Sequence, residues 1–230
     1  NIYTMKNMTL RLIVSATTKM ALGIAIIALL LFLPAGTWAY SGAWRFVALL
    51  FIPMLIMGIA MLILSPELLS RRLQAKEKRT TQQGVVRYSA LIFIVGFVVA
   101  GLDFRNGWSE LPSWAIYTAS TLFVIGYALY GEVMRENIWL ARTITVESNQ
   151  EVITTGLYSL VRHPMYSATV IMFLSIPFIL GSLWAVIPFL CYIPIIVIRI
   201  LDEEKLLRNE LRGYTDYCNI VRWRLVPLIW

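Results

Sequence analysis

The chain contains a single histidine, His163, which stands where a polar segment passes into a long apolar one. Arg162 and Pro164 flank it, and Tyr158 and Tyr166 lie close by in the sequence. An imidazole can donate, accept or titrate near neutral pH, and ionisable groups at a membrane border usually have a function. His163 is therefore either a binding or catalytic residue or a simple cap of the helix that Pro164 would begin. The free N–H groups of such a helix start favour an anionic ligand group.

A second polar group begins where the last long apolar run ends. Arg199 follows Ile198 directly, and a guanidinium at that depth requires an anionic partner from the protein, a lipid or a substrate. Glu203 lies one helical turn later and shares a helix face with Arg199. The simplest alternative is a surface ion pair, which contributes little to stability. Glu204 and Lys205 are expected on an exposed face of the same helix.

The C-terminal segment is aromatic and basic. Tyr214 and Tyr217 are followed by Arg222 and Arg224, and the chain then becomes apolar at residues 228–230. Such a segment is typical of an amphipathic end that lies on a membrane surface. A lid over a binding site is an equally good explanation.

Apolar helices must position these groups. Hydrophobic residues make up 59% of the chain and charged residues 14%, and the mean hydropathy of +0.72 is far from that of soluble proteins. The sequence predicts an all-α, polytopic membrane protein with one domain, residues 1–230. We expect about six membrane-crossing helices, over residues 20–34, 46–65, 88–102 and 114–134 and a C-terminal hairpin of 164–180 and 183–201.

The hairpin is predicted from an apolar run, residues 165–201, that is too long for one crossing and is interrupted at Gly181 and Ser182. Neighbouring helices in a membrane tolerate helix-breaking residues. Kinks are therefore expected in the hairpin at Pro177, Pro188 and Pro194.

The basic residues predict the orientation of these helices. All of the 20 lysines and arginines except Arg45 and Arg105 fall on one side of a membrane crossed an even number of times. Because positive residues accumulate in cytoplasmic loops, both termini and the polar groups above are expected in the cytoplasm. Residues 136–163 and 202–230 would form a cytoplasmic cap that contains the site.

Other classes of site are disfavoured by the sequence. Cys191 and Cys218 are far apart, and with one histidine they predict neither a disulfide framework nor a metal site. The sequence contains no Gly-rich phosphate loop. Lipid headgroups explain the basic cluster between Arg71 and Arg79 better than nucleic acid does, so no nucleic-acid partner is expected.

Taken in order, the polar motifs resemble the C-terminal half of the isoprenylcysteine carboxyl methyltransferase family. The resemblance covers roughly residues 150–227, and the first ninety residues are similar only in being membrane spans. Phospholipid N-methyltransferases and membrane sterol reductases are similar over the same region. The motifs that carry the resemblance are Gly156-Leu157-Tyr158, Arg162-His163-Pro164-Met165-Tyr166, Arg199 to Glu204, and Tyr214 to Tyr217 with Arg222 and Pro227.

The resemblance implies S-adenosylmethionine as a methyl donor and S-adenosylhomocysteine as its product. It also implies a lipophilic acceptor from the bilayer, such as an isoprenylcysteine, whose carboxylate Arg199 would hold as the catalytic residue. Tyr217 would contact that substrate. Gln150 and Glu151 differ in type from the family, so contacts there would come from the backbone. The implied cofactor-binding residues are Gln150, Glu151, Val152, Ile153, Tyr158, His163, Pro164, Met165, Tyr166 and Glu203.

The residue types suit this chemistry. Methyl transfer from a sulfonium is an in-line displacement in which positioning is most of the catalysis. A carboxylate acceptor is already ionised at neutral pH, so an orienting arginine suffices and no general base is required. Glu203 could pair with the ammonium group of the cofactor, and the helix start at His163 with its carboxylate. His163 would then bind without transferring a proton.

Three alternatives remain. A phospholipid N-methyltransferase would use the same cofactor. A sterol-type reductase would use NADPH and an acid such as Tyr158 or Tyr166, but Ser167-Ala168-Thr169 suits close helix packing better than such a site. A lipid-binding or transport protein without enzymatic activity predicts polar residues near the midplane or repeat symmetry, and the sequence shows neither.

Overall fold

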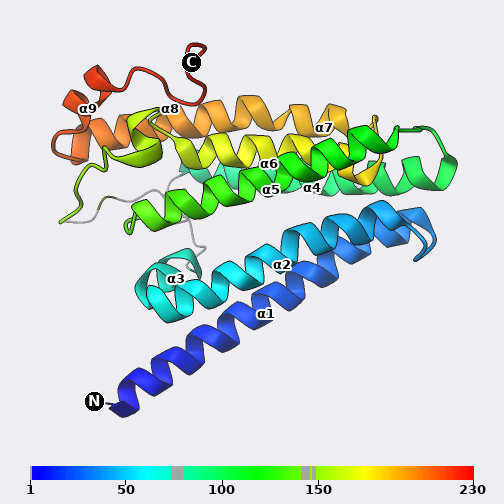
Figure 1. Cartoon of the computed structure of the whole chain (residues 1–230), viewed down its shortest axis with the longest axis horizontal. Coiled ribbons are helices and arrows are strands. Elements are labelled where there is room, and N and C mark those ends of the chain that lie inside the picture. The colour runs from blue at the N-terminus through cyan, green and yellow to red at the C-terminus, as the bar shows by residue number, and fades with distance from the viewer. Residues whose placement is uncertain (1, 74–79, 141–145, 147–148) are drawn as a thin grey trace.

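The computed structural model describes residues 2–73, 80–140, 146 and 149–230, with side chains from Leu10 onward. Every regular element in these ranges is helical, which confirms the prediction of an all-α chain (Figure 1). The elements are α1 (Ile2–Ala35), α2 (Ser41–Leu64), α3 (Pro66–Leu73), α4 (Thr80–Asn106), α5 (Ser113–Glu136), the 3-10 helix η1 (Gly156–Ser159), α6 (Pro164–Leu180), α7 (Val186–Leu190), α8 (Tyr192–Glu210) and α9 (Tyr214–Ile220).

Several of these helices have the properties of membrane spans. Within the described ranges, three are long and apolar enough to cross a bilayer, namely α1 from Leu10 onward, α2 and α4. α6 is a shorter apolar helix of 17 residues. α5 includes the predicted span 114–134 and ends in the charged residues Glu132, Arg135 and Glu136. The polytopic helical class is thus confirmed, and the number of six crossings stays a prediction.

The C-terminal hairpin forms with one difference from the prediction. Its first arm, α6, has the predicted bounds, 164–180. The second arm is not the single helix 183–201 but two helices, α7 and α8, separated at Cys191. Pro194 explains the break, because proline has no N–H for the carbonyl of Leu190 and its ring crowds that carbonyl. α8 then continues to Glu210, so Arg199 lies inside a helix rather than at its end.

The helices run lengthwise beside one another, with the α1–α2 pair on one side of the bundle (Figure 1). α5 packs along most of α6, α1 packs against α4, and α4 also contacts α8. α5 and α6 approach each other closely at Gly126, where a Cβ would lie 2.6 Å from Met172 Cγ and 3.1 Å from the carbonyl oxygen of Ala168. The close packing expected from Ala168 is therefore present.

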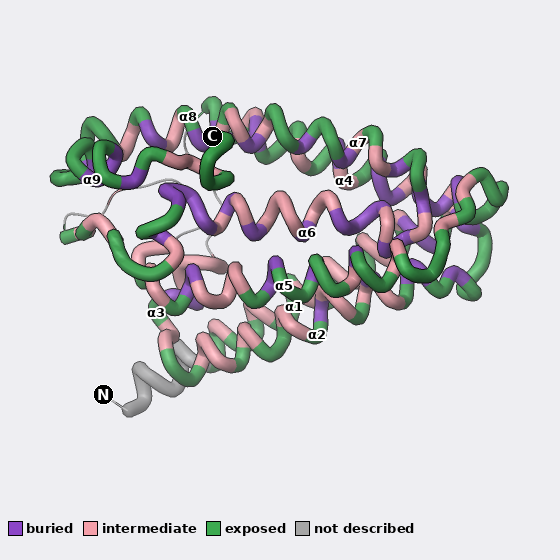
Figure 2. The backbone as a smooth tube through the Cα atoms, turned by 45° about the horizontal axis from the view of Figure 1, so that its top comes forward, coloured by how far each residue is buried: buried purple, intermediate pink, exposed green. Residues whose placement is uncertain are grey.

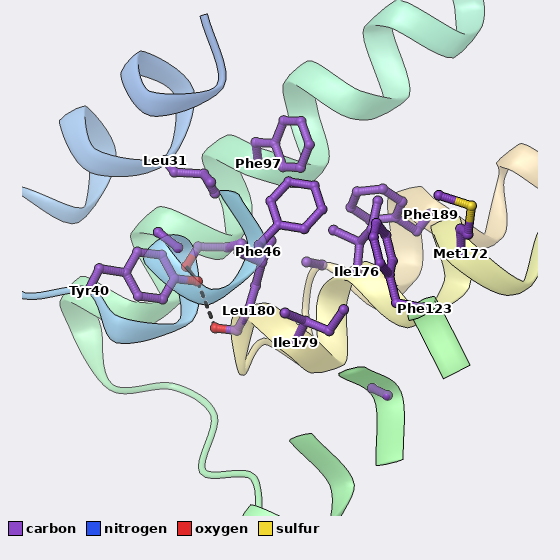
Figure 3. Close-up of a cluster of buried hydrophobic side chains, with 14 of the residues drawn as sticks. Leu31, Tyr40, Phe46, Phe97, Phe123, Met172, Ile176, Ile179, Leu180 and Phe189 are labelled. Carbon is purple, nitrogen blue, oxygen red and sulfur yellow. Dashed lines mark hydrogen bonds between the residues drawn. The ribbon is translucent and has the colours of Figure 1, made fainter. Parts of the chain in front are cut away.

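Aromatic side chains hold the bundle together toward the end that carries α7 (Figure 3). The ring of Phe46 lies 5.5 Å from that of Phe97 and 6.0 Å from that of Phe123, measured between centroids. At the same end the Tyr40 hydroxyl donates to the carbonyl oxygen of Leu180 at 2.7 Å. These contacts join α2, α4, α5 and α6, so the bundle is fixed at the end opposite to η1 and α9 (Figure 1).

The outer surface of α1 and α2 is apolar and exposed. Much of both helices is coloured exposed or intermediate in Figure 2, although their composition is that of a protein interior. A lipid environment removes this conflict because it covers apolar side chains without requiring protein contacts. Examples of such side chains are Leu22, Leu29, Leu33, Ile56, Ile59 and Ile63.

Candidate functional site

The site begins with a turn that only glycine fits. Gly156 starts η1 with a φ of 51°, and a Cβ there would lie 1.4 Å from Glu136 Oε1 at the end of α5. The backbone N–H of Leu157 donates to the other oxygen of Glu136 at 3.1 Å. The turn buries Tyr158, whose hydroxyl accepts a hydrogen bond from Asn137 Nδ2 at 2.8 Å. The Gly-x-Tyr motif is thus built against the end of α5.

His163 is the N-cap residue of α6, with Pro164 at the first helical position as predicted. His163 thus has the cap position that the sequence predicted, but within the described part of the chain its imidazole makes no capping hydrogen bond. Its backbone instead connects the start of α6 to the C-terminal segment. The carbonyl oxygen of His163 accepts from the N–H of Tyr166 at 3.0 Å, and its own N–H donates to the carbonyl of Arg224 at 2.9 Å.

Glu204 is the buried centre of the ion pairs around the helix start. Only 4% of this residue is exposed, so the expectation that Glu204 lies on an exposed face is wrong. Its Oε1 lies 2.9 Å from Arg162 Nε and 3.3 Å from His163 Nε2, and its Oε2 lies 3.0 Å from Arg224 Nε. Lys205 is exposed as expected. One carboxylate therefore holds the α6 start, α8 and the C-terminal segment together.

The charges around Glu204 determine its ionisation. Burial alone would raise the pKa of its carboxyl group. The hydrogen bond from His163, the charge of Arg162 and the hydrogen bond from Arg224 act in the opposite direction. Together they lower the pKa of Glu204 from 4.5 to about 2. Glu204 is therefore an anion at neutral pH.

Arg199 and Glu203 are joined through Tyr166. Arg199 Nε donates to the Tyr166 hydroxyl at 2.8 Å, and that hydroxyl donates to Glu203 Oε2 at 2.5 Å. The ring of Tyr166 also stacks on that of His163, with centroids 5.7 Å apart. Arg199 and Glu203 share one face of α8, as predicted. Tyr166 of α6 supplies the hydroxyl that bonds to both of them.

The C-terminal segment forms one wall of the site. The Tyr217 hydroxyl donates to the carbonyl oxygen of Tyr158 at 2.6 Å, so it holds η1. Its predicted contact with a substrate stays a prediction. The hydroxyl of Tyr214 is buried and has no hydrogen-bond partner among the described residues. Leu225 and Trp230 pack on a cluster formed by α6 and α8. The segment thus covers the site rather than only lying on a membrane.

These residues enclose one pocket, with about 820 Å³ of empty space when its open mouth is included. All twelve residues that the sequence singles out line it, from Gln150 to Ile153, Tyr158, the His163–Tyr166 run, Arg199, Glu203 and Tyr217. Their roles in binding stay predictions. Arg162 and Tyr214, which belong to the same motifs but were not assigned to binding, also line it. The structure adds lining residues outside the motifs, namely Asn137, Trp139, Leu140, Leu207 and Leu211.

Glu204 does not line the pocket, and a signal in the sequence could have revealed its burial. It continues a line of residues spaced by four on α8, after Tyr192, Ile196 and Ile200, all of which are buried. A helix face with this period packs inward along its whole length. An acid in such a face must have buried cationic partners. The partner Arg224 is distant in sequence, so nothing in the local pattern identifies it.

The region that carries most of the pocket is similar to a known protein family. A search of curated proteins finds no match to the chain. A family model matches residues 114–212, which run from the start of α5 to just beyond α8. The match begins earlier than the predicted resemblance and ends before the Tyr214–Pro227 motif. The predicted likeness to membrane methyltransferases is thus confirmed, since residues 114–212 match the phospholipid methyltransferase family, integral membrane enzymes related to the isoprenylcysteine carboxyl methyltransferases.

Proposed function

We propose that this protein transfers a methyl group from S-adenosylmethionine to a lipophilic acceptor in the pocket between η1, α6, α8 and α9. The main support is that residues chosen only from sequence motifs line one cavity. That cavity is built mostly from the region that matches a methyltransferase family. The basic loops on the same side favour a cytoplasmic position.

The residues present fit such a cofactor. Tyr214 leaves a buried hydroxyl without a partner in the described ranges, and a polar ligand in the pocket would satisfy it. Glu203 supplies a carboxylate for an ammonium group, and Val152 and Ile153 supply an apolar wall. When bound, S-adenosylmethionine supplies an electrophilic methyl group on a sulfonium. The protein contributes binding, orientation and exclusion of water.

Arg199 is the residue that we assign to the acceptor. It lies in the pocket wall and is oriented by Tyr166. Guanidinium groups hold carboxylates with defined geometry. A substrate that resembles an isoprenylcysteine would present a carboxylate to Arg199 and keep its apolar chain in the bilayer. Attack by this carboxylate needs no general base, because the acceptor is already ionised.

Phospholipid N-methylation is the second candidate, and the description of the matched family favours it. An ammonium headgroup must lose a proton before its nitrogen can attack. In this reading Glu203 accepts that proton and Arg199 holds the lipid phosphate. The reductase alternative has less support, because burial raises the pKa of Tyr158 and makes it a weaker acid, only partly offset by the hydrogen bond from Asn137.

The assay that tests the proposal uses the full-length protein in lipid nanodiscs with S-adenosylmethionine labelled in its methyl group. The acceptors are a prenylated cysteine, phosphatidylethanolamine and a small thiol. We expect label in the prenylated cysteine, and transfer to phosphatidylethanolamine instead would select the second candidate. We expect Arg199→Ala to abolish transfer and to keep cofactor binding. Absence of label in every acceptor, from protein that binds NADPH, would overturn the proposal.

A further inference from the structure

We propose that Glu204 fixes His163 as a neutral imidazole with its proton on Nε2, so that Nδ1 serves the pocket as a hydrogen-bond acceptor. Glu204 is then a positioning residue, which acts on the pocket only through His163. The protonation state is a property of the protein alone. Its consequence for cofactor binding rests on the proposed function.

The contact between His163 and Glu204 fixes the position of one ring proton. Nε2 of His163 lies 3.3 Å from Glu204 Oε1, and both side chains are buried, with about 5% of each exposed. An ionised carboxylate can only accept hydrogen bonds, so the nitrogen that faces it must carry a proton. The partner of one ring nitrogen sets the role of the other. Nδ1 has no hydrogen-bond partner among the described residues, and His163 lines the pocket.

The charges around the ring disfavour a second proton on it. Among the described residues, the neighbouring cations are Arg162 before α6, Arg224 in the C-terminal segment and Arg199 in α8, and the neighbouring anions are Glu203 and Glu204 of α8 and the exposed Glu151 of the pocket wall. Glu204 is the anion in contact with the ring, and its two oxygens already pair with Arg162 and Arg224. A further proton on Nδ1 would add a buried cation that no anion compensates, which is costly.

The remaining titratable neighbours of the ring are neutral. Tyr166 of α6 stacks on His163 and donates its proton to Glu203. Tyr214 of α9 lies near Glu204, and burial, followed by the charge of Glu204, raises the pKa of Tyr214. Neither phenol supplies the negative charge that a doubly protonated imidazole would need. In the neutral state with a proton on Nε2, the ring donates a hydrogen bond to Glu204. The lone pair on Nδ1 then remains available as an acceptor.

This assignment restricts what the pocket binds next to His163. A lone pair on Nδ1 accepts a ligand N–H or O–H and repels a carboxylate. In S-adenosylmethionine the groups that can donate are the ammonium, the adenine amino group and the ribose hydroxyls. The cofactor carboxylate must therefore lie elsewhere, which differs from the sequence-based expectation that the helix start at His163 holds it.

The experiment uses the fact that His163 is the only histidine of the chain. Protein labelled with ¹⁵N in its histidine ring, purified without a polyhistidine tag and placed in nanodiscs, gives one pair of imidazole signals. At pH 7.5 we expect Nε2 in the protonated region of the spectrum and Nδ1 in the unprotonated region. Two protonated nitrogens, or the reverse assignment, would overturn the proposal without any variant.

Glu204→Gln tests the positioning role, and Glu210→Gln is the matched control because it changes an exposed acid of the same helix. In Glu204→Gln we expect the Nε2–H state to lose its dominance and the KM for S-adenosylmethionine to rise about tenfold, the usual effect of losing one charge-assisted hydrogen bond. The kcat at saturating cofactor should change less than the KM. Unchanged imidazole signals in a folded Glu204→Gln protein would contradict the role of Glu204.

Addition of S-adenosylhomocysteine separates this inference from the proposed function. We expect the Nδ1 signal to move toward the protonated region on binding, while Nε2 stays in place. If S-adenosylhomocysteine binds and the Nδ1 signal does not move, the acceptor role is wrong. If the compound does not bind, the proposed function fails, and the protonation state measured in the free protein still decides the assignment of His163.

Discussion

Tyr166 connects the two charged residues to which the chemistry is assigned. Its hydroxyl accepts from Arg199 Nε and donates to Glu203 Oε2, while its ring stacks on His163. A phenol in this position orients a cation and an anion at the same time without adding charge. The neutral hydroxyl of Tyr166 therefore sets the positions of two ionic groups of the site, Arg199 and Glu203.

Tyr166→Phe removes both hydrogen bonds and keeps the ring that packs in the pocket. We expect the rate of methyl transfer to fall roughly tenfold to a hundredfold, in line with the loss of hydrogen bonds to charged groups. The thermal unfolding temperature should change little. Steady-state kinetics measure the effect, and Tyr88→Phe on the exposed face of α4 is the matched control. Equal rates in both variants would show that Tyr166 does not orient Arg199.

The ion pairs of Glu204 predict a dependence of stability on pH. Because the folded protein lowers the pKa of Glu204 from 4.5 to about 2, this carboxylate stabilises the fold fully above pH 4.5. That stabilisation is lost as the pH falls toward 2. Thermal unfolding between pH 6 and pH 3 should show a smaller loss of stability in Glu204→Gln than in Glu210→Gln. Parallel curves would mean that Glu204 does not contribute.

The helices show which parts of the site a sequence can predict. Local motifs located η1 and the start of α6, because glycine and proline have defined places in turns and helix starts. The motifs did not predict the break at Cys191, since a proline in an apolar run can either kink a helix or end it. They contain Glu204 and Tyr214 but did not predict that these two side chains are buried, because that burial depends on segments distant in the sequence.

The turn at Gly156, which begins η1 and packs against Glu136 at the end of α5, can be tested by substitution. Gly156→Ala places a Cβ on Glu136 and forces a non-glycine residue to a φ of 51°. We expect a destabilisation of about 1–3 kcal/mol and weaker cofactor binding. Gly84→Ala is the control, because no atom of the described residues lies within 4 Å of its Cβ and alanine favours a helix.

The double variant Gly156→Ala with Glu136→Ala separates the two causes. Removing Glu136 relieves the clash and leaves the strained φ, so we expect partial recovery of the unfolding temperature. Recovery is measured by thermal unfolding in the same detergent. A Gly156→Ala protein as stable as the Gly84→Ala control would show that the turn is not built as described.

The whole molecule has two ends with different composition. Aromatic packing fixes the end near α7, and the polar pocket lies at the end with η1 and α9 (Figure 1). Composition predicted the membrane class, because exposed apolar helices such as α2 are stable only in lipid. It could not predict which helices pack together. The close contact at Gly126, for example, depends on where Ala168 and Met172 of α6 fall in space.

The distribution of basic residues predicts that the pocket end faces the cytoplasm. In a background without native cysteines, Glu110→Cys marks the loop between α4 and α5, and Arg212→Cys marks the segment between α8 and α9. Both positions are exposed. A membrane-impermeant maleimide applied to intact cells should label Glu110→Cys and should label Arg212→Cys only after permeabilisation. The opposite pattern would place the pocket on the other side.

Binding of S-adenosylmethionine in the pocket is tested most directly by calorimetric titration of S-adenosylhomocysteine into the protein in nanodiscs. We expect saturable binding with one site per chain. Binding should weaken about tenfold in Glu203→Gln, which removes the carboxylate assigned to the ammonium group, and should be unchanged in the exposed control Glu210→Gln. A protein that unfolds cooperatively on heating and shows no binding of S-adenosylhomocysteine would contradict the account.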